Sequence, residues 1–452
     1  MSKKQKSNSV FDLNGRPSVG KAIPLSIQHV LAMIVGNITP AIIIAGVVGM
    51  GSADKTSLVQ AAMFVAGIAT LIQLYPIWKV GSRLPIIMGV SFAYVPTLIS
   101  LGSEYGIAGI FGAQLVGGLV GVLVGIFIKP LRKFFPPIVA GTVVLTIGLS
   151  LYPVAINYIG GGVGAENFGS LLYLGIAFIT LAVVLVCNHF AKGYFKLASI
   201  LVGIVVGYII SLIAGIVDFA PVREAAWFEL PKFGHFGMEF HGPAIFSMVL
   251  IYIVNSVQAV GDFSATTVGG LGRQVTDDEL SGGIIGNGLT SVVASFFGGL
   301  PTATFSQNVG IVAMTKVVSR FVLALGAGFI LLAGFIPKFG ALMTTIPQSV
   351  LGGATITVFA MITMTGVKLI IQDELSGRNV TVVGLAVALG MGITQVPEIL
   401  SQFPHEVTVI FGNSAVVIAT IVAFVLNIVL PKKTIADEEK ERKAMEAEHE
   451  VA

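Results

Sequence analysis

Two neighbouring carboxamides, Gln307 and Asn308, are the residues whose types and spacing first suggest chemistry. A carboxamide places a hydrogen-bond donor and an acceptor in one plane, and this pattern matches the lactam edge of a nucleobase. Amides inside membranes also hydrogen-bond one helix to another, which is the alternative role for this pair. We favour the ligand, because the pair follows Leu300-Pro301 in a short polar segment that is typical of a broken helix.

A second set of polar residues interrupts otherwise apolar stretches: Gln28, His29, Asn255, Gln258, Asp262 and Asn287. Gln258 and Asp262 are four residues apart, so a helix would place them on one face. Such side chains are costly inside a membrane and usually face a cavity or a partner. We predict that His29, Asp262 and Asn287 support the site or move a proton or ion; for His29 the alternative is a bond to a helix backbone.

Three aromatic residues, Phe92, Tyr94 and Phe305, could supply a stacking surface for a flat ligand. Most of the 29 phenylalanines must face lipid or pack between helices, so residue type alone does not select them. They enter the predicted site because they lie on or beside short segments that follow a proline.

The composition requires lipid as the solvent of this 452-residue chain. Hydrophobic residues make up 55% and charged residues 11%, a ratio that a soluble protein of this length could not cover with a polar surface. The single cysteine, Cys187, excludes a disulfide framework. The basic N-terminus lacks the short apolar core of a removable signal peptide. The net charge of +3 is explained by loop placement, and no nucleic-acid partner is expected.

About fourteen apolar stretches of roughly 20 residues could each cross a membrane as a helix. Their approximate bounds are 22–48, 56–78, 85–101, 105–128, 136–156, 168–189, 197–217, 244–266, 281–299, 302–316, 320–337, 347–370, 379–396 and 412–430. With the N-terminus inside, the basic residues that fall outside are Lys55, Arg223, Lys232 and Lys338, out of 26. Cytoplasmic loops carry the excess of Lys and Arg, so both termini are predicted to be cytoplasmic.

The longest predicted loop, from about 218 to 243, divides the spans into two halves of about seven. An odd number of spans inverts the second half, and inverted repeats are typical of secondary transporters with sites near the bilayer midplane. Leu84-Pro85 and Leu300-Pro301 open corresponding short segments, IIMGVSFAYV and TATFSQNVGIV. Broken segments are tolerated in a membrane where they line a cavity or are buried in protein, which places the predicted site between these two. The alternative is a pair of kinked helices with structural prolines.

The run QNVGIVAMTK, residues 307–316, matches in full the signature of the nucleobase/ascorbate transporter family. That signature reads Gln, Glu or Pro, then Asn-x-Gly, four variable residues, Thr, and Arg, Lys or Gly; its later fixed positions are Gly310, Thr315 and Lys316 here. Further matches cover nearly the whole chain: Gln28-His29, Gly89-Val90-Ser91-Phe92, Ala259-Val260-Gly261-Asp262, Pro347 with Leu351-Gly352-Gly353-Ala354, and Arg378-Asn379. The chain therefore resembles this family, in its bacterial xanthine/uracil permease-like form.

The resemblance implies a fold and an assembly. It implies fourteen spans in a 7+7 inverted repeat, short strands in the broken third and tenth spans, and a homodimer. It implies a core domain at 22–128 and 244–340 and a gate domain at 129–243 and 341–430. A cytoplasmic tail at 1–21 would precede them, and a charged tail at 431–452, a solvated helix or frayed end, would follow.

The resemblance also implies how a base would be held. Gln307, the backbone at Phe92, Ala93 and Tyr94, and an eighth-span side chain would bind it. Gln at the first signature position resembles the purine carriers, whereas vitamin C carriers typically have Pro. Ala93 stands where a polar residue is common in xanthine carriers.

Two departures from the family pattern concern titratable groups. Gln258 replaces the usual Glu of the eighth span, and Asn287 replaces a frequent Asp of the ninth. Coupling would then rely on Asp262 and His29, use another ion, or be weak. Gln258 could still bind a purine, because an amide both donates and accepts.

The sequence therefore predicts an all-α polytopic protein of the bacterial inner membrane that takes up a nucleobase, foremost a xanthine- or urate-like purine, by proton symport and alternating access. One alternative is a uracil or other nucleobase carrier with sodium or weak coupling. Another is an anion carrier or channel of the same architecture. An enzyme would need a catalytic constellation, and a receptor a sizeable soluble domain, and neither is visible. No cofactor or metal is expected; H+ is the expected coupling ion and Na+ the alternative.

Overall fold

The computed structural model describes residues 8–131 and 136–451. Residues 1–7 of the predicted N-terminal tail, 132–135 of the predicted gate domain and 452 of the C-terminal tail lie outside this description. The helices are α1 Val19–Val47, α2 Ser52–Leu74, α3 Val95–Ile126, α4 Ile128–Leu131, α5 Pro137–Ile159, α6 Leu171–Phe190, α7 Tyr194–Leu197, α8 Ser199–Ile213, α9 Ala220–Glu224, α10 Gly242–Thr266, α11 Asp277–Phe296, α12 Ser306–Thr315, α13 Arg320–Ala333, α14 Pro337–Thr344, α15 Gln348–Ile370, α16 Gly377–Gln395, α17 His405–Gly412, α18 Ala415–Val429 and α19 Ile435–Val451. The strands are β1 Met88–Val90 and β2 Thr302–Thr304.

Each predicted span coincides with a helix or with a strand followed by a helix, which confirms the mostly helical membrane fold. The predicted third and fourth spans are joined in α3, which bends at Gly106, where φ is +66°. Among the described residues, eight helices are long and apolar enough to cross a membrane, or up to ten if each of two bent helix pairs is one span. The count of fourteen crossings stays a prediction.

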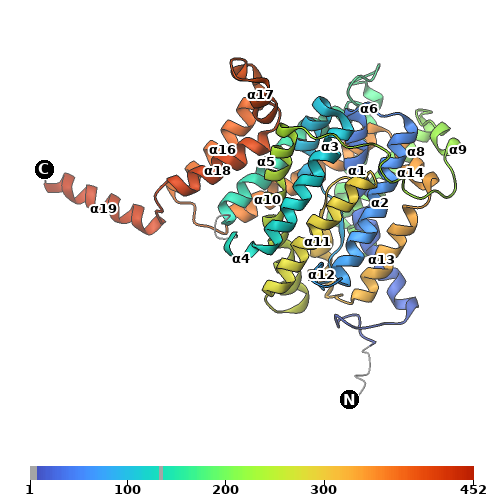
Figure 1. Ribbon diagram of the computed structural model, residues 1–452, viewed down its shortest axis with the longest axis horizontal. Helices are drawn as coiled ribbons and strands as arrows, with labels where there is room; N and C mark the ends of the chain where they lie inside the picture. Colours follow the sequence, from blue (N-terminus) through green and yellow to red (C-terminus); the bar gives the residue numbers. More distant parts are fainter. Residues whose placement is uncertain (1–7, 132–135, 452) are drawn as a thin grey trace. The chain divides into compact units, whose positions relative to one another are not determined.

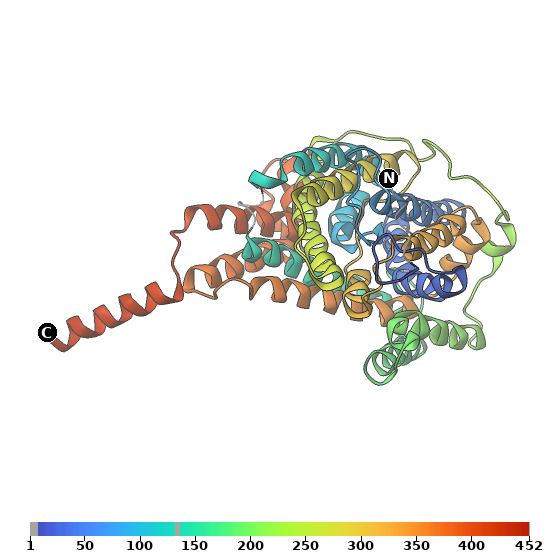
Figure 2. The same ribbon diagram turned by 90° about the horizontal axis from the view of Figure 1, so that it is seen from below.

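The chain divides into two compact units, residues 1–129 with 152–358 and residues 130–151 with 359–452. In the first unit α3 packs against α10 and α11, and α2 packs against α1 and α13 (Figures 1 and 2). Helices α3 and α11 approach closely because glycines meet there: a Cβ on Gly118 would lie 3.0 Å from the carbonyl oxygen of Gly288. Small residues allow such close backbone contact between membrane helices.

The second unit contains the first part of α5, the end of α15, and α16 to α19. Helices α16 and α18 pack together, and an apolar cluster holds them with the start of α5. The members of the cluster are Ile138, Val139, Ile370, Val382, Ala386, Ala419 and Ala423. The charged C-terminal tail forms the helix α19; a helix is one of the two predictions for this tail. Its Glu438 carboxylate accepts a hydrogen bond from the Gly377 N–H at 2.7 Å.

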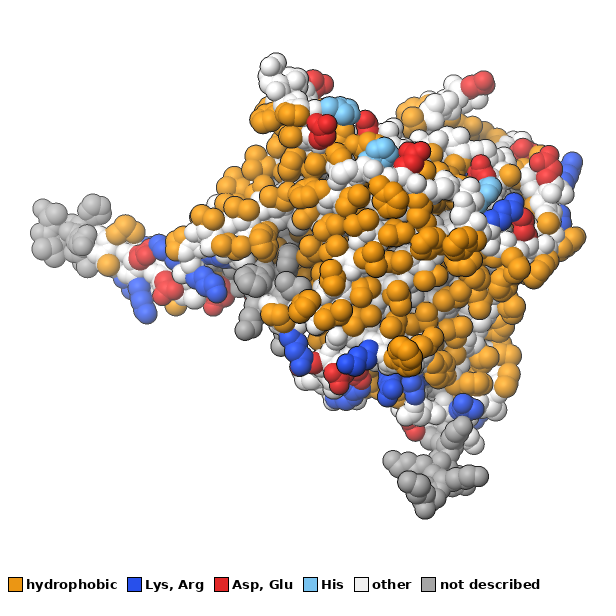
Figure 3. Space-filling model, viewed as in Figure 1, with side chains coloured by type: hydrophobic (Ala, Val, Ile, Leu, Met, Phe, Trp, Pro, Cys, Tyr) orange, Lys and Arg blue, Asp and Glu red, His pale blue; other side chains and the backbone are white. Residues whose placement is uncertain are grey.

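The surface of the first unit fits a lipid environment. Figure 3 shows a broad belt of apolar side chains across the face in view, with charged side chains gathered above and below the belt. Exposed Leu, Ile, Val and Phe side chains are numerous, including Leu123, Ile126 and Phe178, each more than half exposed. Apolar surface on this scale is stable in contact with lipid acyl chains.

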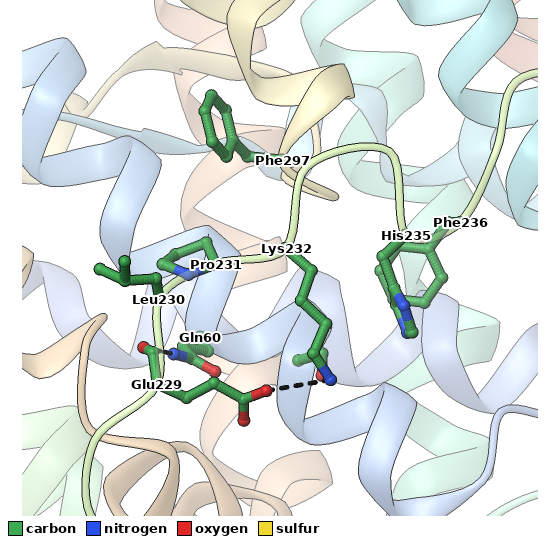
Figure 4. Close-up of a pocket in the computed structure, with 9 residues that line it drawn as sticks. Gln60, Glu229, Leu230, Pro231, Lys232, His235, Phe236 and Phe297 are labelled. Atoms are coloured by element: carbon green, nitrogen blue, oxygen red, sulfur yellow. Dashed lines mark hydrogen bonds and ion pairs between the residues drawn. The ribbon is translucent and has the colours of Figure 1, made fainter.

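The predicted long loop between α8 and α10 belongs to the first unit and contains α9. The Gln60 amide of α2 donates to the carbonyl of Glu229 at 2.7 Å, and Lys232 pairs with the Glu229 carboxylate at 2.9 Å (Figure 4). Near the start of α10, the Glu239 N–H donates to the Ala108 carbonyl at 2.9 Å. Backbone and side-chain contacts therefore fix this connection to α2 and to α3 just after its bend at Gly106.

Candidate functional site

Two short strands meet in the first unit, at the two segments that the sequence predicts to be broken. Strands β1 and β2 are antiparallel, with Met88 opposite Thr304, Gly89 opposite Ala303, and Val90 opposite Thr302. Each strand follows a Leu-Pro pair, and proline disfavours helical backbone in the residue before it. The predicted strands of the third and tenth spans are therefore confirmed.

The outer edges of this strand pair are paired with side chains. The N–H of Met88 donates to Thr70 Oγ1 at 2.9 Å, and the N–H of Val90 donates to Asn37 Oδ1 at 2.8 Å. On the other strand the N–H of Thr302 donates to Ser291 Oγ at 3.1 Å. In a membrane every backbone polar group needs a partner within the protein, so these three side chains allow a two-stranded sheet to exist there.

Asp262, on α10, ties the second broken segment to its neighbour. The Ser306 hydroxyl donates to both carboxylate oxygens, at 2.9 and 3.1 Å, and the Thr304 hydroxyl donates to Oδ2. Asp262 is 9% exposed and forms no ion pair with any described residue. The carboxylate is thus held by hydroxyl donors at the junction where β2 ends and α12 begins.

His29 and Asn308 form the corresponding contact between α1 and α12. The Asn308 amide nitrogen donates to His29 Nδ1 at 3.1 Å and to the His29 carbonyl at 3.0 Å. Because the amide donates to Nδ1, this arrangement assigns the imidazole proton to Nε2. Both side chains are buried, and Nε2 of His29 and Oδ1 of Asn308 have no hydrogen-bond partner among the described residues.

Phe305 packs in the centre of this assembly. Its ring lies between α1 and β1, since a Cβ on Gly36 would be 2.9 Å from Cε1 and one on Gly89 would be 2.6 Å from Cε2. Tyr94, fully buried, packs against Tyr252 of α10 with ring centroids 4.9 Å apart. The aromatic rings predicted to stack on a ligand are thus largely in contact with protein.

Gln258 and Gln307 differ from Asp262, His29 and Asn308 in exposure and in hydrogen bonding. Both side chains are partly exposed, and neither makes a hydrogen bond with another described residue. Gln258 lies one turn before Asp262 on α10, and Gln307 follows Ser306, which donates to that same Asp262. The two amides therefore flank one fixed junction with their donors and acceptors free.

The remaining predicted residues are buried on other elements of the first unit. Phe92 and Ala93 are buried in the short helical turn that follows β1, where the Ala93 N–H donates to Ser91 Oγ at 3.1 Å. Asn287 is buried on α11, and its Oδ1 has no partner among the described residues. It precedes Ser291, the residue that pairs the edge of β2, by four positions.

The last residues of the signature, Thr315 and Lys316, lie at the C-terminal end of α12. The Thr315 hydroxyl donates to the Ile311 carbonyl at 2.8 Å, and Lys316 follows in left-handed backbone with φ of +58°. The Lys316 ammonium donates to the Gly269 carbonyl. Glycine favours this conformation, which gives a physical reason for glycine being allowed at this signature position. Gly310 is exposed on α12.

Sequence reasoning missed five residues that build the site: Asn37, Thr70, Ser291, Thr304 and Ser306. Asn37 carried a usable signal, because an amide within an apolar span is costly unless it is paired. The four hydroxyl residues carried none, since Ser and Thr are common in membrane helices and usually bond their own backbone.

A family model described as a permease family matches residues 20–399. The chain belongs to the permease family of nucleobase/ascorbate transporters. The family resemblance drawn from the sequence is thereby confirmed, and so is the prediction of a transporter rather than an enzyme. A permease with these apolar helices is a multi-pass membrane protein.

Two curated relatives align with this permease over most of its length. The xanthine permease of Bacillus subtilis (strain 168) is 36% identical over 417 residues, which cover 92% of this chain and 94% of the relative. The uric acid permease PucK of the same organism is 37% identical over 406 residues, which cover 89% and 94%.

A solved structure shares the fold of this permease. The transmembrane domain of the cyanobacterium bicarbonate transporter BicA superposes with a TM-score of 0.55 at 16% identity, over 90% of this chain and 97% of that domain. At this identity the similarity concerns the fold alone.

Proposed function

We propose that this permease is a secondary transporter of a nucleobase, and that its substrate is a purine of the xanthine or uric acid type. The observation that carries the proposal is the pair of free amides, Gln258 and Gln307, on either side of the Asp262 junction. Curated relatives that align over about nine-tenths of the chain are named xanthine and uric acid permeases.

The proposed recognition uses hydrogen bonds to the edge of the base. An amide offers a donor and an acceptor in one plane, so each glutamine can pair with an adjacent N–H and C=O of a lactam. Phe92, Ala93 and Tyr94 contribute the wall of the site on the side of β1, and Phe305 forms the wall between the strands and α1. Asn308 contributes its Oδ1, the atom that its contact with His29 leaves free.

A pyrimidine and an anion are the alternatives to a purine substrate. A pyrimidine such as uracil has the same lactam edge, so the amides by themselves accept it; the purine is preferred because of the named relatives. An anion, the cargo in the name of the bicarbonate transporter, would be expected to meet a cationic group. The proposed site residues include a carboxylate and no lysine or arginine apart from Lys316, whose ammonium bonds the carbonyl of Gly269.

For the driving ion we propose the proton, with Asp262 as the group that binds it and His29 as a second exchange point. Asp262 accepts hydrogen bonds from two hydroxyls and has no cationic partner among the described residues, so it can be neutralised without breaking an ion pair. Asn287 and Gln258 are amides where relatives of this family usually carry acids, which leaves Asp262 as the carboxylate of the proposed site.

Alternating access completes the proposal. The core domain, 22–128 and 244–340, moves against the gate domain, 129–243 and 341–430, and carries the base across the midplane. We further propose a homodimer in the bacterial inner membrane with both termini cytoplasmic, as the family resemblance and the loop charges favour.

The test is uptake of radiolabelled xanthine into a host that lacks purine transporters. Uric acid, guanine, adenine, uracil and ascorbate are added as competitors, with and without a protonophore. We expect xanthine and uric acid to compete at the lowest concentrations, and accumulation above the outside concentration to collapse when the protonophore is added. The absence of competition by any base would contradict the assignment, and accumulation that survives the protonophore would contradict proton coupling.

Asp262→Asn separates coupling from binding. The asparagine keeps the size of the side chain but cannot be charged, so concentrative uptake should fall at least about 10-fold while exchange of bound base persists. The matched control is Asp278→Asn, an exposed carboxylate in the first turn of α11. Equal accumulation by the Asp262 and Asp278 variants would remove Asp262 from the coupling mechanism.

A further inference from the structure

A pocket rich in arginine lies at one end of the first unit, away from the strand pair. It has a volume of about 270 Å3 and is lined by Leu13, Asn14, Gly15, Arg16, Tyr75, Arg320 and Phe321. Three segments that are distant in sequence build it: the N-terminal segment, the residue after α2, and the start of α13. Among the described residues that line it, two are arginines and none is a carboxylate.

Arg320 is fixed by neutral groups. Its Nη1 donates to the carbonyl of Leu74 at 2.9 Å, Nη2 donates to Asn14 Oδ1, and the guanidinium lies over the Tyr75 ring, 5.3 Å from its centroid. Its Nε is buried and has no partner among the described residues. The guanidinium is therefore held in a set position, half buried, while its positive charge is unbalanced.

Arg16 adds a second unbalanced charge. It is exposed, and neither it nor Arg320 forms an ion pair with any described carboxylate. Asp12 is the acid closest to Arg16 in sequence, and its Oδ1 accepts a hydrogen bond from the Asn14 N–H at 3.0 Å. Arg320 is a partly buried charge without a counter-charge, which is costly, so an anion bound between it and Arg16 would be favourable.

The N-terminal segment is attached to the core in a way that keeps the pocket formed. The N–H groups of Val318 and Ser319 donate to the Val10 carbonyl at 3.0 and 3.1 Å. The Ser319 hydroxyl donates to the Gly15 carbonyl at 2.8 Å, and the Arg320 N–H donates to the Leu13 carbonyl at 3.1 Å. These bonds fix residues 10–15 beside the start of α13.

The segment that follows α2, which supplies Tyr75 to the pocket, carries aromatic side chains typical of a membrane interface. Tyr75 is 42% exposed, and Trp78, three residues later, is 95% exposed. Amphipathic aromatic side chains gather at the level of lipid headgroups, where basic residues attract anionic lipids. Arginine guanidinium groups bind phosphate through paired hydrogen bonds.

We propose that Arg16 and Arg320 form a binding site for a phosphate group, supplied by the headgroup of an anionic phospholipid. A bound phosphate would join the N-terminal segment to the start of α13 and balance both charges. The site is separate from the proposed base site, so it stands or fails independently of the proposed substrate.

The test uses the purified full chain and native mass spectrometry. Phosphatidylglycerol and phosphatidylcholine are offered in equal amounts, and retained lipid is counted for the wild type, Arg16→Gln, Arg320→Lys and Lys192→Gln. Lys192 is an exposed cation outside the pocket and serves as the matched control. We expect the wild type and Lys192→Gln to retain phosphatidylglycerol preferentially, and Arg16→Gln to lose that preference by about 10-fold.

Arg320→Lys keeps the charge but loses the planar fork, so an intermediate loss is expected. If this variant does not fold, Arg16→Gln decides, because Arg16 is exposed and no hydrogen bond of its side chain to another described residue would be lost. Equal loss in Lys192→Gln, or no phosphatidylglycerol preference in the wild type, would overturn the lipid site.

A second arm distinguishes the source of the phosphate. Sodium phosphate is added to delipidated protein in detergent at constant ionic strength, and the melting temperature is measured against sodium chloride. A rise in the wild type that is absent in Arg16→Gln supports the same site with free phosphate as its occupant. No response to phosphate and no preference for phosphatidylglycerol together overturn the proposal.

Discussion

At the scale of single residues, the polar side chains around the strands differ in whether their hydrogen bonds are already made. Asp262 accepts from Thr304 and Ser306, and Asn308 donates to His29, so these groups hold α1, α10 and α12 together. Gln258 and Gln307 make no such bond with a described residue. Residues of the first kind should affect stability when replaced, and those of the second kind should affect binding.

Gln307→Ala tests the second kind. The alanine removes a donor and an acceptor that bind the base in our proposal, so xanthine affinity should fall about 10- to 100-fold, as expected for loss of about 1–3 kcal/mol. Scintillation proximity binding to purified protein measures this, and thermal unfolding should change little. Gln274→Ala, in an exposed loop, is the control. Unchanged xanthine affinity in Gln307→Ala would refute its contact with the base.

Glu279, ahead of the predicted span 281–299, carries the pH prediction at this scale. Burial raises the pKa of its carboxyl, but hydrogen bonds from Arg273 and Thr276 and the Arg273 charge outweigh that effect and lower the pKa below 4.5. A lowered pKa in the folded state contributes stability above the unfolded value, and this contribution is lost as the pH falls through the folded pKa. The pair is partly exposed, so its contribution at neutral pH is about 0.5 kcal/mol.

The corresponding variant is Glu279→Gln. Its melting temperature should lie below that of the wild type at pH 7, and the gap should close as the pH falls below about 4.5. Thermal unfolding in detergent across a pH series measures the gap, with Glu374→Gln in the second unit as the control. A gap that widens in acid would show that the Arg273 pair does not set the pKa of Glu279.

At the scale of elements, each broken span is a strand followed by a helix. The strands can exist inside the protein because Thr70, Asn37 and Ser291 pair their outer N–H groups. Alternation along β2 directs Thr302 and Thr304 toward the hydroxyl and carboxylate groups of α10 and α11. Asn37 belongs to α1, so the position of the proposed site also depends on how tightly the strands pack against that helix.

Gly89→Ala tests that packing. The new Cβ would lie 2.6 Å from Cε2 of Phe305 and 2.7 Å from Oδ1 of Asn37. The Phe305 ring cannot withdraw easily, because Gly36 of α1 contacts its other edge. We expect a loss of about 1–3 kcal/mol in unfolding free energy and weaker xanthine binding.

The matched control is Gly328→Ala on α13, where a Cβ would meet nothing within 4 Å. Alanine in a helix interior is at least as stable as glycine, so this variant should melt at or above the wild-type temperature. Equal melting temperatures for the Gly89 and Gly328 variants would show that the strands have room to separate.

At the scale of the whole molecule, the orientation predicted from loop charges can be tested with the single cysteine. Cys187→Ser gives a background without thiols, into which Lys232→Cys or Lys440→Cys is introduced. The two positions lie in the long loop before α10 and in α19. A membrane-impermeant maleimide should label position 232 in intact cells and position 440 only after permeabilisation. Labelling with the opposite preference would invert the predicted topology.

The sequence determined the class, the family and the approximate place of the two broken segments. The apolar composition required lipid, the repeated apolar stretches predicted the helices, and Leu84-Pro85 and Leu300-Pro301 marked the two segments that leave helical backbone. These are properties of local composition and backbone chemistry, so they can be read without coordinates. The signature at 307–316 identified the family for the same reason.

Only the tertiary structure decided which polar groups are already paired. His29 and Asn308 are 279 positions apart, and Asp262 and Thr304 are 42 apart, so the local sequence around these residues does not predict their contacts. The same holds for Asn37 and the N–H of Val90. Hydrogen-bond partnership depends on which helices pack together, and that packing leaves the Gln258 and Gln307 side chains partly exposed and without a hydrogen bond to another described residue.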